Sequence, residues 1–280
     1  MARDAFDQKA GRGGDHRTPS RRTFVLALGL GALALGTTPA VATKADDGCE
    51  KSRYAGARYI VCRFDPASVE VRIVWRDSNN AAFGSLGAVR RAVRRSGREF
   101  LFAMNAGMYH QDLSPVGYHV EHRKKLKNAN TRRGPGNFHL LPNGIFFLEN
   151  GRAGVMETRA FLKRNKRPEY ATQSGPMLVI NGRIHPKFNP ASTSRKSRNG
   201  VGVSKDGRSL IFALSEEPVT FHQFARLFQR GLKTENALFL DGGSVPQMQS
   251  KSMTSLSFAP VGPVVAVMRT PSEKRTGVTR

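Results

Sequence analysis

The chain is short of acidic residues: it holds 21 Asp and Glu against 45 Lys and Arg, a formal net charge of +24 at pH 7. Residues 1–42 contain six of the cations and three of the acids, so an excess of +21 belongs to residues 43–280. Such a deficit favours anionic partners: phosphorylated glycans, nucleic acid or an anionic membrane surface. A surplus that only keeps the protein soluble explains the same count.

The chain also lacks the signatures of common nucleic-acid-binding modules, with no RNP motif, zinc-finger spacing or helix-turn-helix pattern. We therefore expect no nucleic acid among its partners. Beyond residue 42 no apolar run is long enough to cross a bilayer, so we expect no stable membrane insertion once residues 1–42 are removed. Hydrophobic residues make up 39% and charged residues 24%, which is typical of a soluble globular protein.

The N-terminal segment has the layout of an export signal. Arg21 and Arg22 precede an apolar run that ends at Leu35 and is too short and too rich in Gly and Ala for a good transmembrane helix. Small residues follow, with the expected cleavage site after Ala42. The paired arginines resemble a twin-arginine signal, so we expect residues 1–42 to be removed and the mature protein to be periplasmic or secreted. An uncleaved anchor is the alternative.

Cysteine is nearly absent, and the two that occur, Cys49 and Cys62, lie shortly after the signal. In an oxidising compartment a pair without a third predicts one disulfide. A turn at residues 54–56 brings the two sides antiparallel. Two cysteines with no nearby His fall short of the ligand count of a zinc site, and a catalytic thiol has no visible partner.

The mature chain reads as many short strands with only two clear helices. Helical spacing of apolar residues occurs at 85–96 and again at 221–231, where Thr220 is the expected cap. Apolar or alternating runs predict strands, and Asn-Gly or Asp-Gly pairs beginning at positions 143, 150, 181 and 206 predict hairpin turns. We predict an α+β fold with a mostly antiparallel sheet. The predicted strands include 57–64, 69–75, 100–104, 145–149, 177–180, 200–204, 210–214, 237–240 and 261–268.

Domain organisation is simple. Without a long linker or a repeat, residues 45–270 are expected to form one domain. Residues 271–280 are polar and expected to be a disordered tail. Within the domain, residues 108–140 are a long, polar stretch with Gly and Pro, and such segments are often functional.

One strand end stands out as a place for chemistry. The apolar run 237–240 stops at Asp241, which Gly242, Gly243 and Ser244 follow. The strand holds the carboxylate on a rigid support, and the glycines allow a ligand to approach while their N–H groups form a small anion-binding concavity. On spacing alone, a plain strand followed by an Asp-Gly turn is an equally good interpretation.

Three other polar turns border strands, and the ordered set resembles the phosphodiester glycosidase family. The resemblance covers roughly residues 58–268 and rests on four elements, each weak alone. Here Tyr109 replaces the family's common second aromatic, with His110 after it, and the last turn has one glycine fewer than the versions with three. The four elements are Asn105-Ala106-Gly107-Met108-Tyr109, Gln173-Ser174-Gly175-Pro176, Arg198 before a Gly-containing strand, and Leu240-Asp241-Gly242-Gly243.

The resemblance implies a hydrolase that cleaves the glycosidic bond of a sugar-1-phosphodiester, with no cofactor. Asp241 would be the nucleophile or the base that activates water, and Arg198 would hold the phosphate. Asn105, the third expected catalytic residue, would bind sugar hydroxyls or an N-acetyl group, as would Gln173. The other expected substrate contacts are Gly107, His110, Gly175, Gly242, Gly243 and Ser244.

Several alternatives stay open. A second carboxylate has three candidates, Asp112, Glu121 and Glu216. His119 and His122 beside Glu121 suggest a metal, but they lack the i, i+4 spacing of a metalloprotease helix, and we expect none. Two other functions use the same residues: a non-catalytic envelope module that binds anionic glycans, and a metal-dependent phosphodiesterase that cleaves the P–O bond.

Overall fold

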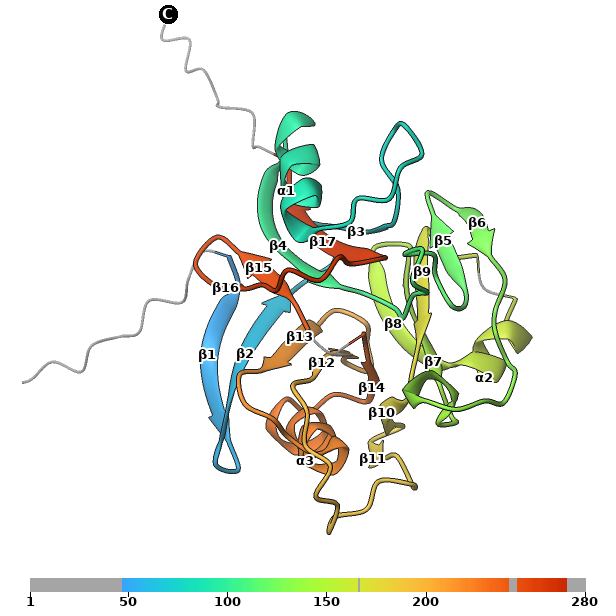
Figure 1. Ribbon diagram of the computed structural model, residues 1–280, viewed down its shortest axis with the longest axis vertical. Helices are drawn as coiled ribbons and strands as arrows, with labels where there is room; N and C mark the ends of the chain where they lie inside the picture. Colours follow the sequence, from blue (N-terminus) through green and yellow to red (C-terminus); the bar gives the residue numbers. More distant parts are fainter. Residues whose placement is uncertain (1–46, 166, 242–245, 271–280) are drawn as a thin grey trace, which may run out of the picture. The chain divides into compact units, whose positions relative to one another are not determined.

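The fold is built from three antiparallel sheets and a few short helices (Figure 1). The computed structural model describes residues 47–165, 167–241 and 246–270. The expected N-terminal signal, residues 1–42, and the expected C-terminal tail, residues 271–280, therefore lie outside the described residues. The described residues form one compact unit. The predicted α+β class with mostly antiparallel pairing is confirmed.

The largest sheet has seven strands, two of which border Arg198 and Asp241 of the candidate site. Its hairpin turns were predictable: Asn181 (φ 48°) with Gly182 connects two strands, and Gly207 (φ 73°) lies in the turn between two others. Both positions need a left-handed backbone, which Asn and Gly adopt readily. In spatial order the strands are β1 Cys49–Tyr54, β2 Ala57–Phe64, β13 Leu210–Ser215, β12 Asn199–Val203, β14 Asn236–Phe239, β10 Met177–Ile180 and β11 Arg183–Ile184.

The second sheet has five strands and is covered by helix α1, Leu86–Arg95. Ser85 caps this helix by accepting a hydrogen bond from the Ala88 amide, and the helix buries an apolar face of Leu86, Val89 and Val93. Gly97 (φ 73°) follows its end. In spatial order the strands are β16 Thr254–Ser255, β15 Met248–Ser250, β4 Glu99–Asn105, β17 Val264–Arg269 and β3 Glu70–Val74.

The third sheet also has five strands and takes in part of the stretch predicted to be irregular. Its spatial order is β6 Lys124–Lys127, β5 His119–Glu121, β9 Tyr170–Ser174, β7 Gly144–Glu149 and β8 Arg152–Glu157. Two further helical segments belong to this region, the 3₁₀ turn Asn137–His139 and helix α2, Thr158–Lys163, which the sequence did not predict.

One predicted hairpin is wrong. Asn143 is buried and its side chain donates to the Phe138 carbonyl over 3.0 Å, while Gly144 begins β7 and faces both Glu157 and Ser174. Local sequence favoured a turn there, but pairing with strands on both sides decided otherwise. The next pair, Asn150 and Gly151, does form the expected turn between β7 and β8.

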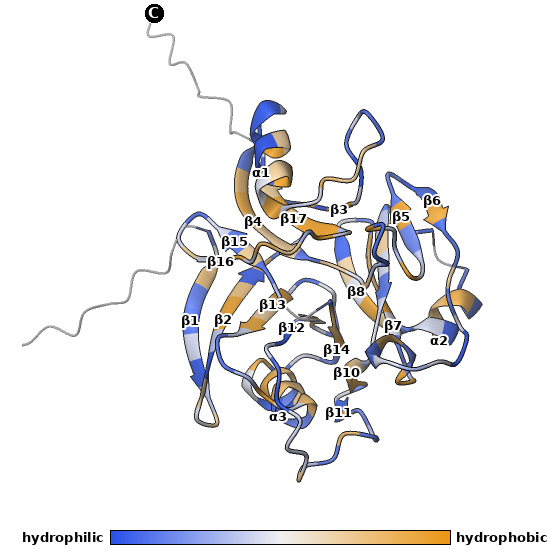
Figure 2. Ribbon diagram, viewed as in Figure 1, coloured by the Kyte–Doolittle hydropathy of each residue, from blue (hydrophilic) through white to orange (hydrophobic). Residues whose placement is uncertain are grey.

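The main core lies between the sheets, and a second apolar layer covers the outer face of the seven-stranded sheet (Figure 2). Helix α3, Phe221–Arg226, continues as the π-helical turn Leu227–Gly231 and supplies that layer with Phe224 and Phe228. Thr220 caps α3 through a capping box with Gln223, as predicted. Both faces of the central strands are therefore dry, which explains their near-continuous apolar sequence.

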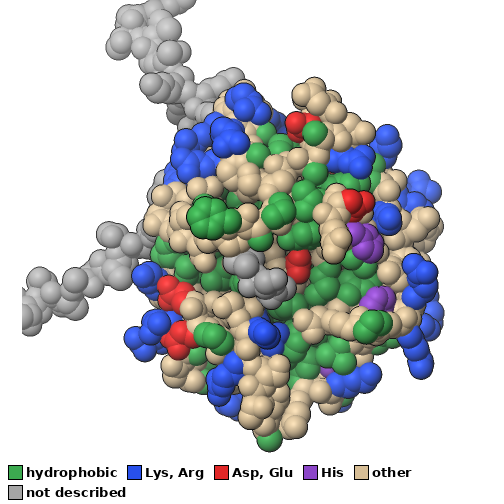
Figure 3. Space-filling model, viewed as in Figure 1, with side chains coloured by type: hydrophobic (Ala, Val, Ile, Leu, Met, Phe, Trp, Pro, Cys, Tyr) green, Lys and Arg blue, Asp and Glu red, His purple; other side chains and the backbone are tan. Residues whose placement is uncertain are grey.

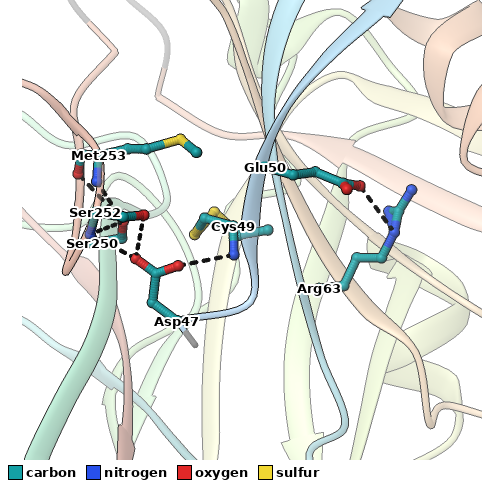
Figure 4. The surroundings of a disulfide bond; sticks show 8 residues. Asp47, Cys49, Glu50, Arg63, Ser250, Ser252 and Met253 are labelled. Carbon is teal, nitrogen blue, oxygen red and sulfur yellow. Dashed lines mark hydrogen bonds and ion pairs between the residues drawn. A yellow bond between two sulfur atoms is a disulfide. The ribbon is translucent and has the colours of Figure 1, made fainter. Parts of the chain in front are cut away.

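The predicted disulfide is present: Cys49 and Cys62 face each other across the β1–β2 hairpin (Figure 4). Beside it Asp47, 1% exposed, accepts hydrogen bonds from the Cys49 amide and from the amide and hydroxyl of Ser252. Burial opposes ionisation of Asp47, but these hydrogen bonds and one from Ser250 outweigh it and lower its pKa. The start of the folded unit is thus fastened to the β15–β16 turn.

Within the part of the chain that the structure describes, no helix combines the length and apolar character needed to span a membrane.

Candidate active site

Asn105, at the end of β4, ties together the segments on which the candidate site is built. It is 1% exposed. Its side-chain amide donates to the main-chain carbonyl of Asp241, and its side-chain oxygen accepts from Asn199 over 3.0 Å and from the Gln247 amide over 2.9 Å. Both ends of the amide are used inside the protein. Asn105 therefore fixes the position of Asp241. This role differs from the contact with the sugar that the sequence suggested for Asn105.

Asp241 leaves the seven-stranded sheet just after β14 and meets the first polar turn. Its amide donates to the Ala106 carbonyl over 2.9 Å, so the chain is held on both sides of the peptide unit. The residue is half-buried. These contacts bring together the end of β4, at Asn105, and the end of β14, before Asp241.

The register of the sheet sets Asp241 opposite Arg198. Gly200 faces Phe239 in the β12–β14 pair, and the Leu240 amide donates to the Asn199 carbonyl over 3.2 Å. One step further along the same register, Arg198 and Asp241 are opposed. Opposed residues direct their side chains to the same face of a sheet. The guanidinium carbon of Arg198 is 5.7 Å from the Phe239 ring, which lies on that face.

Arg198 is a buried cation that has no carboxylate partner among the described residues. It is 3% exposed, and its guanidinium carbon is 3.5 Å from the centre of the Phe221 ring. Nε donates to the Val219 carbonyl over 2.9 Å and Nη2 reaches the Ser194 carbonyl at 3.4 Å. Among the described residues Nη1 has no hydrogen-bond partner. Buried charges are normally paired, so an unneutralised guanidinium marks a place for an anion.

Burial lowers the pKa of Arg198 to about 10, so the group is fully charged near neutral pH. A stack of planar side chains holds the guanidinium in place. Phe221 stacks on Phe188 with ring centres 5.0 Å apart, and Phe188 stacks on His185 at 4.6 Å. The attraction between a cation and an aromatic face stabilises the guanidinium and leaves its charge unneutralised.

Tyr109 belongs to the site, although the sequence did not mark it as a substrate contact. Its hydroxyl donates to the Pro260 carbonyl over 3.0 Å and also reaches the Asp241 side chain. Burial, followed by the charge of Asp241 and the hydrogen bond with it, raises the pKa of Tyr109 to about 12. The phenol therefore keeps its proton beside the carboxylate. Its place directly after the first polar turn was the available signal.

Gln173 and the two described glycines serve the architecture. The Gln173 side chain accepts from the amides of Tyr118 and Asn130, each over 2.9 Å, and donates to the Asn130 carbonyl over 2.8 Å. Its side chain therefore binds the long 108–140 segment, whereas the sequence suggested that it binds the sugar. A Cβ on Gly107 would lie 2.4 Å from the Gln173 carbonyl oxygen, and one on Gly175 would lie 2.7 Å from the Asn143 Cβ. Only glycine fits this close backbone approach.

Three expected substrate contacts, Gly242, Gly243 and Ser244, lie outside the described residues. His110 is exposed in a turn in which the Leu113 amide donates to its carbonyl over 2.9 Å. It lies next to Tyr109 and stays a prediction as a substrate contact.

The candidates for a second carboxylate are all engaged elsewhere. Asp112 is exposed and accepts from the amide and hydroxyl of Ser114, which lowers its pKa. Glu216 forms an ion pair with Arg58 at 3.8 Å. Glu121 accepts from the Trp75 amide over 2.8 Å and lies 2.8 Å from His119 Nε2.

The possible metal set does not converge. His119 points to Glu121, while the His122 ring lies 2.9 Å from the Tyr170 hydroxyl. Within the described ranges no group of three metal-binding side chains forms.

Asn199 is a buried residue that supports Asn105 and that sequence patterns did not reveal. It is fully buried, and its side-chain amide donates to the carbonyl and side-chain oxygens of Asn105. Its own side-chain oxygen has no partner. A buried acceptor without a donor is costly and is often matched by a ligand or water. Its contact with Asn105 forms only when β12 and β4 come together in the fold.

Comparison with known proteins defines the class. The sequence profile of the phosphodiester glycosidase family matches residues 98–274, so the chain belongs to that family. Glycosidase hydrolase chemistry on phosphodiesters is the property of the family as a whole.

Individual relatives share sequence or fold with this chain. The chain is 34% identical over 236 residues to the uncharacterized protein YigE of Escherichia coli strain K12, covering 80% of this chain and 90% of that one. Its fold is similar to the catalytic domain of zebrafish N-acetylglucosamine-1-phosphodiester alpha-N-acetylglucosaminidase, auto-inhibited by its pro-peptide, with a TM-score of 0.52 at 15% identity over 78% of this chain and 81% of that one. A hypothetical protein from Synechocystis gives a TM-score of 0.50 at 16% identity over 79% of this chain, which spans 61% of that longer one.

Proposed function

We propose that this protein is an exported hydrolase that cleaves the glycosidic bond of a sugar-1-phosphodiester in exopolysaccharide or another cell-envelope glycan. One observation carries the proposal above all: a buried arginine without a carboxylate partner, opposed to Asp241 across β12 and β14. Family membership supports the reaction class. The signal-like residues 1–42 support export.

Each half of the substrate meets a group suited to it. The bond that breaks joins the anomeric carbon to a phosphate oxygen, and the phosphate monoester of the aglycone leaves as a stable anion that needs little protonation. Arg198 Nη1, which lacks a partner, donates to a phosphate oxygen and stabilises the charge that grows on the leaving group. Its stacking on Phe221 holds the guanidinium in one orientation.

Asp241 acts on the sugar side. Charge on the anomeric carbon becomes positive as the bond lengthens, and a fixed carboxylate stabilises it. Asp241 then either bonds to that carbon or takes a proton from the water that does. The Tyr109 hydroxyl orients the carboxylate, and Asn105 and Ala106 fix its backbone.

The test is a screen of sugar-1-phosphodiesters with a methyl aglycone, which differ in sugar and in anomeric configuration. The wild-type protein hydrolyses at least one of them, and Asp241→Asn lowers kcat by at least about 100-fold while substrate still binds. Asp206→Asn is the matched control, because Asp206 lies in the exposed β12–β13 turn and accepts only from Ser204 and Arg208.

The competing function is a non-catalytic envelope module that binds anionic glycans through the same groups. It gains support from the large positive charge of residues 43–280. Calorimetry on the same phosphodiesters separates the two. Binding by the wild-type protein with no turnover of any member of the panel selects the module and rejects the hydrolase.

A further inference from the structure

The segments around Arg198 are depleted of acidic residues far beyond the average of the chain. Residues 122–148 contain no Asp or Glu, and neither do residues 170–205. Each of these ranges holds six Lys or Arg. The positive charge of the protein is therefore concentrated in two stretches, and the second contains Arg198 itself.

Both stretches reach the candidate site. The Arg132 amide donates to the Asn130 side chain over 3.1 Å, and Asn130 is bonded to Gln173 through both its amide and its carbonyl. Gln173 in turn packs against Gly107, two residues after Asn105. The other stretch approaches the candidate site through Arg195, which lies three residues before Arg198. The Arg195 guanidinium donates to the Gln223 side chain over 3.0 Å.

The two stretches also meet each other. The backbone of Leu140 and Leu141 lies against the His185 imidazole. Leu140, Phe188 and Met108 pack in one apolar cluster. One continuous margin therefore runs along the site, and its exposed cations are Arg132, Arg133, Lys187, Arg195 and Lys196. We call these five residues the cationic margin.

The cationic margin is unpaired. Among the described residues none of its five members lies within ion-pair distance of a carboxylate, whereas Arg58, Arg98 and Arg123 each have an acidic partner. Figure 3 shows Lys and Arg side chains spread around the edge of the drawn face, with few carboxylates among them. Unpaired cations of this density raise the local concentration of polyanions.

Grooves accompany the charges. A cavity of about 470 Å³ is lined by Lys127, Asn130 and Arg132, and another of about 330 Å³ is lined by Arg133 and Asn143. Thr131 borders both, so they adjoin. The two cavities thus hold three cations, Lys127, Arg132 and Arg133, and the second also holds Arg159 and the carboxylate of Glu157.

We propose that the substrate is a polyanion, a glycan whose sugars are joined by repeated phosphodiesters, and that the cationic margin holds the repeats next to the one that is cleaved. The inference rests on the proposed function. A single phosphodiester carries one negative charge, which Arg198 alone accommodates. Five further exposed cations match the additional negative charges that neighbouring repeats bring.

Nucleic acid is the weaker match for the same charges. Proteins that bind single strands combine cations with exposed aromatic side chains on which bases stack. Every Phe and Tyr in residues 122–148 and 170–205 is buried, among them Phe138, Tyr170 and Phe188. The margin thus offers contacts to phosphates and hydroxyls and no stacking surface for bases.

The experiment measures binding to the Asp241→Asn protein, which separates affinity from turnover. The probes are synthetic oligomers of N-acetylglucosamine 1-phosphate with one, three and six phosphodiesters, a neutral chitin hexamer, and a DNA strand with six phosphates. We expect affinity to rise at least about tenfold from one to six phosphodiesters and to fall steeply with added salt. The neutral hexamer binds weakly.

Two triple variants locate the effect. Lys187→Gln, Arg195→Gln and Lys196→Gln together remove the length dependence. Arg91→Gln, Arg94→Gln and Arg95→Gln together remove three exposed charges from α1, and this variant keeps the length dependence of binding. Equal affinity at all lengths, equal effects of the two triples, or tighter binding of the DNA strand would each overturn the inference. Length-dependent binding by a wild-type protein that hydrolyses none of the oligomers would refute the proposed hydrolysis and retain the polyanion site.

Discussion

The guanidinium carbon of Arg198 lies 3.5 Å above the Phe221 ring, and this contact takes the place that a carboxylate occupies beside most buried arginines. A carboxylate would neutralise the charge, whereas an aromatic face holds the cation and leaves it able to bind an anion. The stack of Phe188 and His185 behind Phe221 keeps that ring in place. The position of the guanidinium that we propose binds the phosphate thus depends on an apolar layer that covers the outer face of the sheet.

Phe221→Leu tests this contact. The variant keeps an apolar residue at the start of α3 but removes the aromatic face, so kcat/KM for a sugar-1-phosphodiester is expected to fall by at least about tenfold. Phe161→Leu is the matched control, since Phe161 is 1% exposed and lies in α2. Comparable losses of stability with a loss of kcat/KM only in Phe221→Leu support the account. Equal kinetic losses in both variants would show that Phe221 contributes packing alone.

The alkaline limb of the pH profile reports Arg198. Burial lowers its pKa to about 10, so its positive charge is complete below about pH 9 and is lost as pH rises above 10. We expect KM for a phosphodiester, whose own charge is constant in this range, to be flat from about pH 6 to 9 and to rise above 10.

Tyr109 does not contribute to that limb, because its pKa is raised to about 12 by burial and then by Asp241. Tyr109→Phe therefore leaves the midpoint of the limb unchanged, although it changes the orientation of the carboxylate. A midpoint that moves by a pH unit in this variant contradicts the assignment to Arg198.

His185 makes stability depend on pH. Burial, the largest effect, lowers its pKa to about 4 in the folded protein from an ordinary 6.5. The unfolded chain binds the proton first, so the stabilisation is complete above about pH 6.5 and is lost as pH falls toward 4. His185→Phe keeps the ring against Phe188 and is expected to reduce the loss of unfolding free energy between pH 7.5 and 4.5 by about 2 kcal/mol. Urea unfolding at the two pH values measures it, and an unchanged difference argues against a neutral buried imidazole.

The disulfide supports the fold and leaves the site chemistry alone. Cys49 and Cys62 are 13 residues apart, and replacing both with Ser is expected to lower the unfolding free energy by about 2–4 kcal/mol. Denaturant unfolding measures this, with the wild-type protein in reductant as the comparison. The folded variant retains its kcat, since Asp241 and Arg198 are held by strands other than β1. An unchanged unfolding free energy in both samples would mean that the disulfide does not stabilise the fold.

Local features of the fold were readable from the sequence, and contacts between distant segments were not. The turn at Asn181-Gly182 and the cap Thr220 follow from the conformations and hydrogen bonds that single residues prefer. Asn143 misled because a buried position between two strands overrode its turn preference. Helix α2 spans only Thr158–Lys163, too short for a periodic signal.

The same division applies to the site. Asp241 and Arg198 stand in recognisable motifs, but their opposition depends on the β12–β14 register. Gln173 looked like a ligand contact because it lies in such a motif, and only the structure reveals that Asn130 and Tyr118 occupy its side chain. A sequence names the residues of a motif, while their partners across sheets decide which of them remain open to substrate.

The most direct test of the central claim is hydrolysis in water enriched in the heavy isotope of oxygen. If Asp241 acts at the anomeric carbon while Arg198 holds the leaving phosphate, the C–O bond breaks and the heavy oxygen appears on the sugar. Mass spectrometry of both products gives the answer in one turnover experiment. We predict a labelled sugar and an unlabelled phosphate. Label in the phosphate would mean that the P–O bond breaks, and the account given for Asp241 would be wrong.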